Sequence, residues 1–217
     1  MRTFKLCPGT IAYEDDYLLI IDKPPGMLIH PTVNESGCTL YDHVAAYYKE
    51  QGIDRGIHPV SRLDRNTSGL VIFAKEPVIQ FWLSQQQIDK EYLAIVTGTL
   101  PAKAGVIEAP IARKEGSIIE RCVSYKGKYA KTAYKALLHK GDKTLVQLRL
   151  YTGRTHQIRV HMAHIGCPLY NDNLYGTPGP QSRHALHAYK LAFIHPVSDK
   201  PLEITRALPK DLRKIIY

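Results

Sequence analysis

Short apolar runs that end at turn residues recur along the whole chain, and most of them are too short to form a helix. The two clearest occupy residues 17–22, closed by a Lys-Pro-Pro-Gly turn, and residues 70–74. Similar runs follow at 92–96, 132–138, 144–150, 189–194 and 202–205. Short apolar runs between Gly or Pro turns are typical of buried strands. Because strands mostly follow strands, the pattern predicts an α+β fold in which helices flank a mixed, largely antiparallel central sheet.

Two stretches between these strands have the spacing of helices. Thr39 stands before the first helix as a candidate N-cap, and Gly52 fits its C-terminal end. Pro77 suits the first turn of the second helix, where a backbone N–H would have no helical partner. The apolar positions expected for this second helix are Val78, Phe81, Trp82 and Leu83.

A third helix is expected after residue 155, and a basic segment precedes it in the chain. Thr155 is the candidate N-cap of this helix, and Gly166 is its expected end. Its apolar face would hold Ile158, Met162 and Ile165. Residues 109–131 combine short strand candidates with many Lys, Arg and Gly residues. This composition predicts an exposed basic hairpin or insertion rather than core.

The charge balance favours a polyanionic partner. The 217 residues include 29 Lys and Arg against 20 Asp and Glu, which gives a net charge of +9. Such an excess is most often a footprint of nucleic-acid binding, although many basic proteins simply carry solvated lysines. The length suffices for one sizeable core, and no linker or repeat divides it. We therefore expect one domain over residues 1–217 and a monomer.

The cysteines and the start of the chain indicate a cytoplasmic protein. Four cysteines are scattered without a C-x-x-C pair, so we expect reduced thiols: Cys7, Cys38, Cys122 and Cys167. Residues 1–6 lack the apolar stretch of a signal peptide, and no apolar run is long enough to span a membrane. Neither a P-loop motif nor a G-x-G-x-x-G motif occurs, so we expect no nucleotide cofactor.

Two positions near strand starts could carry chemistry. Asp64 lies between Arg62 and Arg65, directly before a buried strand. Nearby cations favour an ionised carboxylate, which could act as a nucleophile or an electrostatic stabiliser. Asp64 could equally be a turn residue beside exposed arginines. Tyr92, at the start of the next strand, could stack on a base or could be a core tyrosine.

A third candidate lies at residues 152–161. Gly153 precedes a helix start, where backbone N–H groups favour anions such as phosphate. Arg154, His156 and Arg159 cluster there, although an ordinary basic helix start would look the same. Histidines are also numerous, at positions 156, 161, 164, 184 and 187. No H-E-x-x-H motif joins them and their surroundings are basic, so we expect no metal site.

Taken in order, several separated segments carry a family likeness. They are residues 17–26 with His30-Pro31, 62–69, 90–98, 127–134, 152–161, and 186–188 with His195-Pro196. Together these motifs resemble the RluA-type family of RNA pseudouridine synthases, nearly from end to end. The resemblance implies the pseudouridine synthase catalytic fold with a central active-site cleft, and no cofactor. It also implies a bare catalytic domain, without the N-terminal RNA-binding domain with which many relatives begin.

The resemblance assigns a role to each candidate residue. Asp64 would be the catalytic aspartate, Tyr92 the aromatic that packs against the target uracil, and Arg159 the ion-pair partner of Asp64. Arg62 would contact RNA near the flipped base. The other expected RNA contacts are Arg65, Arg154 and His156.

Three departures from the family pattern leave these roles untouched. Ser61 stands where His is frequent, and Gly166-Cys-Pro168 and Asn171-Asp172 stand where Gly-His-Pro and Gly-Asp are frequent. They concern the subgroup and its substrate rather than the chemistry.

The resulting hypothesis is an isomerase that converts specific uridines in ribosomal or transfer RNA to pseudouridine. Specificity would reside in the basic segment between Arg113 and Lys131, and RNA affinity would depend strongly on salt. The alternatives are a non-catalytic RNA-binding or ribosome-assembly factor on the same scaffold, and a histidine-rich metal hydrolase.

Overall fold

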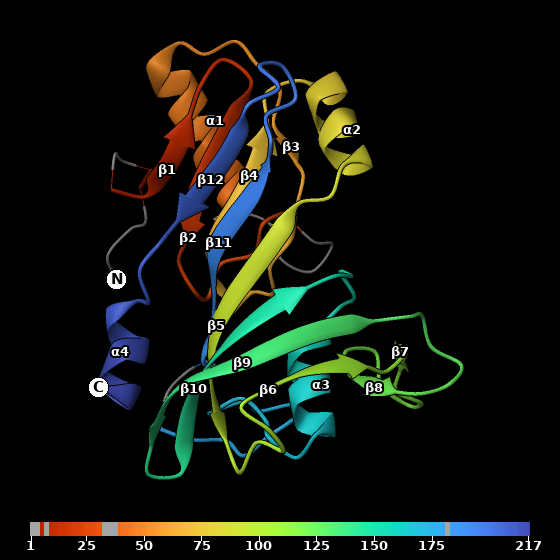
Figure 1. Cartoon of the computed structure of the whole chain (residues 1–217). Helices are drawn as coiled ribbons and strands as arrows, with labels where there is room; N and C mark the ends of the chain where they lie inside the picture. The colour runs from red at the N-terminus through yellow and green to blue at the C-terminus, as the bar shows by residue number, and fades with distance from the viewer. Residues whose placement is uncertain (1–4, 7–8, 32–38, 181–182) are drawn as a thin grey trace. The chain divides into compact units, whose positions relative to one another are not determined.

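The computed structural model describes residues 5–6, 9–31, 39–180 and 183–217, and the chain forms two compact units (Figure 1). The first unit combines residues 1–88 with 190–206, and the second combines 89–189 with 207–217. Strand β11, Leu186–Ile194, contains the point where the chain returns to the first unit. The expectation of one catalytic domain over 1–217 stays a prediction.

Four strand pairs of the first unit are antiparallel. The strands are β1 (Ile11–Glu14), β2 (Leu18–Lys23), β3 (His58–Pro59), β4 (Ser68–Ala74) and β12 (Pro201–Thr205). β2 pairs with β1 and β4, β3 pairs with β4, and β12 pairs with residues 190–194 of β11. Every residue of β4 is buried. This central strand therefore matches the expectation of a continuous apolar run covered on both faces.

Alternate residues of β2 and β4 build two separate cores. Leu18 and Ile20 pack with Leu70 and Ile72 in one cluster, which also holds Ile79 and Leu83. Leu19 and Ile21 pack with Val71 and Phe73 in the other, which also holds Leu40 and Val44. Because side chains alternate between the faces of a strand, each cluster covers one face of the sheet. Each fully buried side chain stabilises the unit by about 1.5–3 kcal/mol relative to exposure.

One helix supplies each cluster. α1 (Leu40–Gln51) begins with a capping box between Thr39 and Asp42 and ends at Gly52, whose φ of 67° is left-handed, as predicted. α2 (Pro77–Gln85) has Pro77 in its first turn, also as predicted.

The apolar face expected for α2 is partly wrong. Ile79 and Leu83 are its buried residues, whereas Val78, Phe81 and Trp82 are exposed. The helix is apolar around most of its circumference, so its composition does not distinguish the buried stripe from the exposed one.

The second unit contains four antiparallel strands, in which β5 pairs with the last strand rather than the next one, and a separate small hairpin. The four strands are β5 (Asp89–Thr97), β6 (Ala104–Glu108), β9 (Lys131–Lys140) and β10 (Lys143–Leu150). They lie in the order β5-β10-β9-β6, and all these neighbours are antiparallel. β7 (Ile111–Arg113) and β8 (Arg121–Val123) form the separate two-stranded sheet. The predicted basic hairpin within residues 109–131 is thereby confirmed.

Two helices complete the second unit. α3 (Gln157–His164) is the predicted third helix, but its N-cap is His156 with a left-handed φ of 57°, so the cap expected at Thr155 is wrong. The Gln157 side chain closes this loop instead, because its carbonyl oxygen accepts from the Arg154 N–H at 2.9 Å. α4 (Lys210–Ile216) was not expected from the sequence; its Leu212 and Ile216 pack in a cluster with Ile95 and Leu145.

The predicted fold class is confirmed as α+β, a mixed sheet with few helices. Among the described residues, no helix is both long and apolar enough to cross a membrane. Cys122 and Cys167 are unbonded thiols, whereas Cys7 and Cys38 lie outside the described residues.

Candidate active site

Asp64 lies in the loop that joins β3 to β4 in the first unit. Its carbonyl accepts a hydrogen bond from the Thr67 N–H at 3.0 Å, which closes a tight turn directly before the buried strand. Asp64 is half-buried, whereas Arg62 and Arg65 on either side of it are exposed. The turn therefore presents two cations to solvent and holds the carboxylate between them.

A buried lysine holds the Asp64 turn in place through hydrogen bonds to backbone carbonyls. Lys23, at the end of β2, has no exposed surface. Its Nζ donates to the carbonyls of Pro24 at 2.9 Å, Met27 at 3.0 Å and Arg65 at 3.0 Å. A buried ammonium is tolerated because these three acceptors match its three N–H donors. The Lys-Pro-Pro-Gly turn thus holds the backbone of the residue that follows Asp64.

Gly26 adds two further bonds to the same turn. Its N–H donates to the Arg65 carbonyl at 2.9 Å, and Arg65 Nε donates to the Gly26 carbonyl at 3.1 Å. Gly26 has a φ of 84°, a backbone conformation that favours glycine. The first motif of the sequence therefore acts as a scaffold for the loop that carries Asp64.

Tyr92 belongs to the second unit, on β5 opposite Leu148 of β10. Its side chain is nearly buried, with 7% exposed. The next residue back, Glu91, accepts from Gln147 Nε2 at 2.5 Å and from the Tyr189 hydroxyl at 2.6 Å. Burial also lowers the pKa of Lys90. The start of β5 is therefore a well-ordered, partly desolvated region, and the role of Tyr92 stays a prediction.

The loop before α3 is held by one buried amide. Gln157 accepts from the Thr152 hydroxyl and the Arg154 N–H, both at 2.9 Å. It donates to the Lys131 carbonyl and the Thr132 hydroxyl, both at 3.0 Å. With all four hydrogen-bonding positions occupied, the amide locks the loop onto β9. Arg154 itself is exposed.

The Arg154 side chain is anchored at its inner end. Its Nε donates to the Tyr129 carbonyl at 2.9 Å, which ties this arginine to the segment before β9. The Arg154 side chain is exposed, and its role as an RNA contact stays a prediction.

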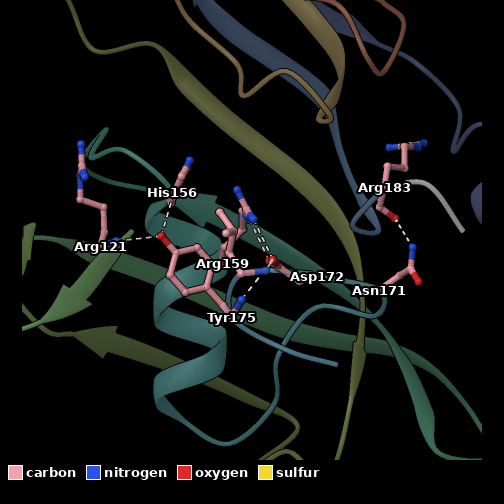
Figure 2. A network of polar contacts seen from close by, with 8 residues as sticks. Arg121, His156, Arg159, Asn171, Asp172, Tyr175 and Arg183 are labelled. Atoms are coloured by element: carbon pink, nitrogen blue, oxygen red, sulfur yellow. Dashed lines mark hydrogen bonds and ion pairs between the residues drawn. The ribbon is translucent and has the colours of Figure 1, made fainter. Parts of the chain in front are cut away.

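Arg159 and Asp172 form a buried bidentate ion pair (Figure 2). Arg159 Nε donates to Asp172 Oδ2 at 2.8 Å, and Nη2 donates to Oδ1 at 2.7 Å. The side chains are 6% and 0% exposed. Burial alone would raise the pKa of Asp172, but the hydrogen bonds and charge of Arg159 hold it below its ordinary value. The carboxylate thus stays ionised and fixes the guanidinium plane.

Tyr175 covers this pair and contacts His156 (Figure 2). Its ring lies 5.0 Å from Arg159 Cζ, and its N–H donates to Asp172 Oδ1 at 3.3 Å. The hydroxyl lies 2.7 Å from His156 Nδ1 and accepts from the Arg121 N–H at 2.9 Å. Burial raises the pKa of this hydroxyl.

The structure divides the predicted site residues between the two units. Arg62, Asp64 and Arg65 share one loop of the first unit, while Tyr92, Arg154, His156 and Arg159 belong to the second. Tyr175 brings His156 and Arg159 together.

Sequence reasoning missed Asp172 and Tyr175. The signal for Asp172 was present, since Asn171 stands where the family often has Gly. Asn171 has a left-handed φ of 64°, a conformation that Asn tolerates better than most residues. The departure therefore preserves the backbone that places Asp172.

The histidines considered as metal ligands have other partners. His161 lies 2.9 Å from the Thr132 hydroxyl and 2.9 Å from the Ala109 carbonyl, and burial lowers its pKa. Burial, together with the charge of Arg183, lowers the pKa of His187 to about 4. Within the described ranges, no three His, Cys, Asp or Glu side chains are grouped in a way that could hold a metal ion.

Solved structures define the class of protein to which this fold belongs. The human RNA pseudouridylate synthase domain containing 4 superposes with a TM-score of 0.77 at 22% identity, over 94% of this chain and 90% of the human one. The human RNA pseudouridylate synthase domain containing 1 gives a TM-score of 0.75 at 24% identity, over 94% and 85%. The fold is therefore that of pseudouridine synthases.

Sequence comparisons establish the family. The family model for RNA pseudouridylate synthases matches residues 17–164. A Bacillus subtilis protein described as an uncharacterized RNA pseudouridine synthase, YjbO, is 38% identical over 214 residues, which are 96% of this chain and 76% of that protein. Ribosomal large subunit pseudouridine synthase D of Yersinia pestis is 37% identical over 230 residues, 96% of this chain and 70% of that protein.

The chain therefore belongs to the RluA-type family of RNA pseudouridine synthases, and the resemblance seen in its motifs is confirmed. Its activity is the isomerisation of uridine in RNA, and RNA is its partner.

Proposed function

We propose that this enzyme isomerises specific uridines in ribosomal or transfer RNA and that Asp64 is its catalytic carboxylate. The observation that carries the proposal is the half-buried carboxylate in a turn held by Lys23 and Gly26, inside the motif that carries the family's aspartate. Similarity to large-subunit ribosomal RNA synthases, such as the one from Yersinia pestis, favours ribosomal RNA over transfer RNA.

The reaction needs no redox change and no group donor. The bond between N1 of uracil and C1′ of ribose breaks, the base turns, and C5 bonds to C1′. A proton leaves C5 and N1 gains one, so atoms balance without a cofactor. A carboxylate is the group that such a reaction needs at the ribose or the base, and Asp64 supplies it.

The target uridine must leave its stack before it reacts. Extruding a base from folded RNA costs a few kcal/mol. Arg62 is exposed next to Asp64 and offsets this cost by occupying the vacated space and contacting phosphate. Tyr92, nearly buried on β5, packs against the uracil and keeps the detached base from being lost to water.

Arg159 orients the catalytic carboxylate in this proposal. Asp172 engages the Nε and Nη2 edge of its guanidinium. A planar guanidinium presents a second edge to a second carboxylate, and that edge serves Asp64. In this proposal the buried ion pair with Asp172 therefore fixes the orientation of the Arg159 guanidinium for its contact with Asp64.

Basic groups of both units bind the RNA backbone. Arg154 and His156 lie at the loop before α3, and Arg65 lies beside Asp64. The segment 109–131 holds six Lys or Arg against two Glu. Phosphate contacts of this kind give affinity that falls steeply with salt. Shape and loop bases of the RNA then determine which uridine is modified.

Release of tritium from RNA labelled at C5 of uridine tests the proposal. Wild-type protein should release tritium from ribosomal RNA of cells that lack the gene, and Asp64→Asn should release none above background. Asp142→Asn, at an exposed position in the turn after β9, is the matched control and should retain full turnover. An RNA-binding assembly factor would bind the same RNA and leave every uridine unchanged. RNA binding by the wild-type protein without tritium release would therefore contradict the proposal.

A further inference from the structure

Tyr175 touches elements that are far apart in the sequence. Its hydroxyl accepts from the Arg121 N–H of β8 at 2.9 Å and lies 2.7 Å from His156 Nδ1 before α3 (Figure 2). Its ring faces Arg159 at 5.0 Å, and its N–H donates to Asp172. A single side chain thus joins the small hairpin, the loop before α3 and the buried ion pair.

The ring of Tyr175 also packs in an apolar cluster. Its neighbours there are Ile111 of β7, Ala130, Val160 of α3 and Val123 of β8. The two hairpin strands and α3 therefore share one small core with this ring. Any displacement of the hairpin is transmitted to the ring by packing as well as by the hydroxyl, because close-packed side chains have little room to adjust.

Two polar partners engage the Tyr175 hydroxyl. The Arg121 N–H can only donate, so the Tyr175 oxygen is its acceptor. The same hydroxyl forms a hydrogen bond of 2.7 Å with His156 Nδ1 and so ties the loop before α3 to the hairpin. His156 has a left-handed φ, which is unfavourable for a residue other than glycine. Contacts such as this one hold the loop in that conformation.

The hairpin is internally rigid, so it can act as one piece. The Arg121 guanidinium donates to the carbonyls of Ile119 at 3.1 Å and Glu120 at 3.0 Å. Lys114 and Glu120 form an ion pair of 2.9 Å across the turn. Arg121 binds the hairpin turn through its guanidinium and the Tyr175 hydroxyl through its backbone N–H. The turn of the hairpin and the Tyr175 contact therefore move together.

We propose that Tyr175 is a positioning residue that couples RNA docking on the segment 109–131 to the placement of Arg159. The inference rests on the proposed function, in which this segment binds the RNA backbone and Arg159 orients Asp64. RNA bound on the basic hairpin holds β8 in position. Because the Tyr175 ring and hydroxyl contact this hairpin, they in turn hold Arg159 and His156 in position. Tyr175 itself does not touch the reacting uridine.

The first test separates binding from chemistry in Tyr175→Phe. Phenylalanine keeps the ring over Arg159 and removes both hydroxyl bonds. We expect the single-turnover rate at saturating RNA to fall about tenfold while the Kd for RNA stays within about twofold. Nitrogen-15 spectra of His156 should show a shifted Nδ1 signal, because this nitrogen loses its bond to the Tyr175 hydroxyl. An unchanged rate would overturn the proposal.

A matched control distinguishes this effect from lost stability. Tyr13→Phe also removes a hydrogen-bonded tyrosine hydroxyl, from Asp15 at 2.6 Å in the other unit, and should leave the turnover rate unchanged. An equal loss of rate in both variants would show a general structural effect and would contradict the proposal. Inactivity of the wild-type enzyme on every RNA would instead be a failure of the proposed function.

The second test addresses the coupling itself. Lys126→Gln with Lys128→Gln neutralises two charges of the segment 109–131. In the wild-type background this pair should lower the saturated rate about threefold as well as weaken binding. In the Tyr175→Phe background the same pair should lower the saturated rate by clearly less than threefold, because the hydroxyl part of the link to Arg159 is already removed and only ring packing is left. Rate losses that multiply independently would contradict the coupling.

Discussion

Asp172 clamps Arg159 through two charge-assisted hydrogen bonds of 2.8 and 2.7 Å, and both side chains are almost wholly buried. Such a pair seldom adds much stability compared with apolar packing, because both charges lose their hydration. Its value here is geometric, since it fixes the plane of the guanidinium that we assign to the catalytic carboxylate. The clamp also explains why an acidic residue is needed after Asn171.

Asp172→Asn should destabilise the second unit by about 3–5 kcal/mol at pH 7, because it leaves a buried guanidinium without its counter-charge. The folded pKa of Asp172 lies below its ordinary 3.8, so the unfolded chain takes up the proton first. The pair's contribution is therefore complete above that ordinary value and is lost as the pH falls through the lowered pKa.

Denaturant titrations between pH 7 and pH 3 measure both effects. The variant should show a smaller acid-dependent loss below about pH 4 than the wild type, and the part that it keeps comes from other carboxylates with lowered pKa values, such as Asp15 and Asp211. Asp54→Asn, at an exposed position, is the control and should match the wild type. Equal stability of Asp172→Asn and wild type at pH 7 would contradict the clamp.

Lys23→Met should destabilise the first unit by about 2–4 kcal/mol, because the carbonyls of Pro24 and Met27 lose this donor and that of Arg65 keeps the Gly26 N–H, while methionine fills the space. Chemical denaturation measures the loss. Lys5→Met, whose side chain is exposed beside Glu50, should change stability by less than about 0.5 kcal/mol. Since Lys23 holds the Asp64 turn, the folded variant should also turn over more slowly; full stability and full activity would show that the turn stands without it.

The free energy of unfolding should decrease as the pH is lowered from 6.5 to about 4, and His187 is the group responsible. Burial and the charge of Arg183 lower the pKa of His187 in the folded state from 6.5 to about 4. Between these two values the unfolded chain binds a proton at this histidine and the folded protein does not. The contribution is complete above 6.5 and is lost as the pH falls through this window, by about 3 kcal/mol. Unfolding free energies at pH 7.5 and 4.5 should differ by much less in His187→Gln, and an equal difference in both proteins would rule out His187 as the source.

RNA affinity should fall steeply with salt, and the segment 109–131 should carry part of the slope. Each phosphate contact contributes roughly 0.7–0.9 to the slope of log K against log salt concentration. Arg113→Gln and Lys126→Gln should each reduce the slope by about that amount, whereas Lys49→Gln on α1 should not. Filter binding over a range of salt concentrations checks this, and a flat response in the wild type would refute the electrostatic account.

The sequence predicted the parts of the fold that depend on local patterns. The apolar runs of β2 and β4, the N-cap at Thr39 and the helix end at Gly52 all follow from short-range rules, and all were found. The third helix was also found, but its cap was not, because Gln157 reaches back to the loop and makes Thr155 unnecessary. The short strands β1, β3 and β6 and the helix α4 gave no signal strong enough to separate them from loops.

The site shows the same limit. Motif resemblance proposed roles for Asp64, Tyr92 and Arg159, because each belongs to a contiguous stretch of sequence, and these roles stay predictions. Asp172 and Tyr175 were missed, since their roles arise only when the segment after α3 folds back on Arg159. Long-range polar contacts of this kind have no local periodicity from which they could be predicted.

Tritium release from C5-labelled uridine RNA by Asp64→Asn, compared with wild type and Asp142→Asn, tests the central claim most directly. The account predicts that Asp64→Asn binds RNA normally and loses at least about a thousandfold in single-turnover rate, because the carboxylate acts only in the chemical step. Asp142→Asn should match the wild type. An Asp64→Asn enzyme that binds RNA and releases tritium at the wild-type rate would contradict the assignment of Asp64.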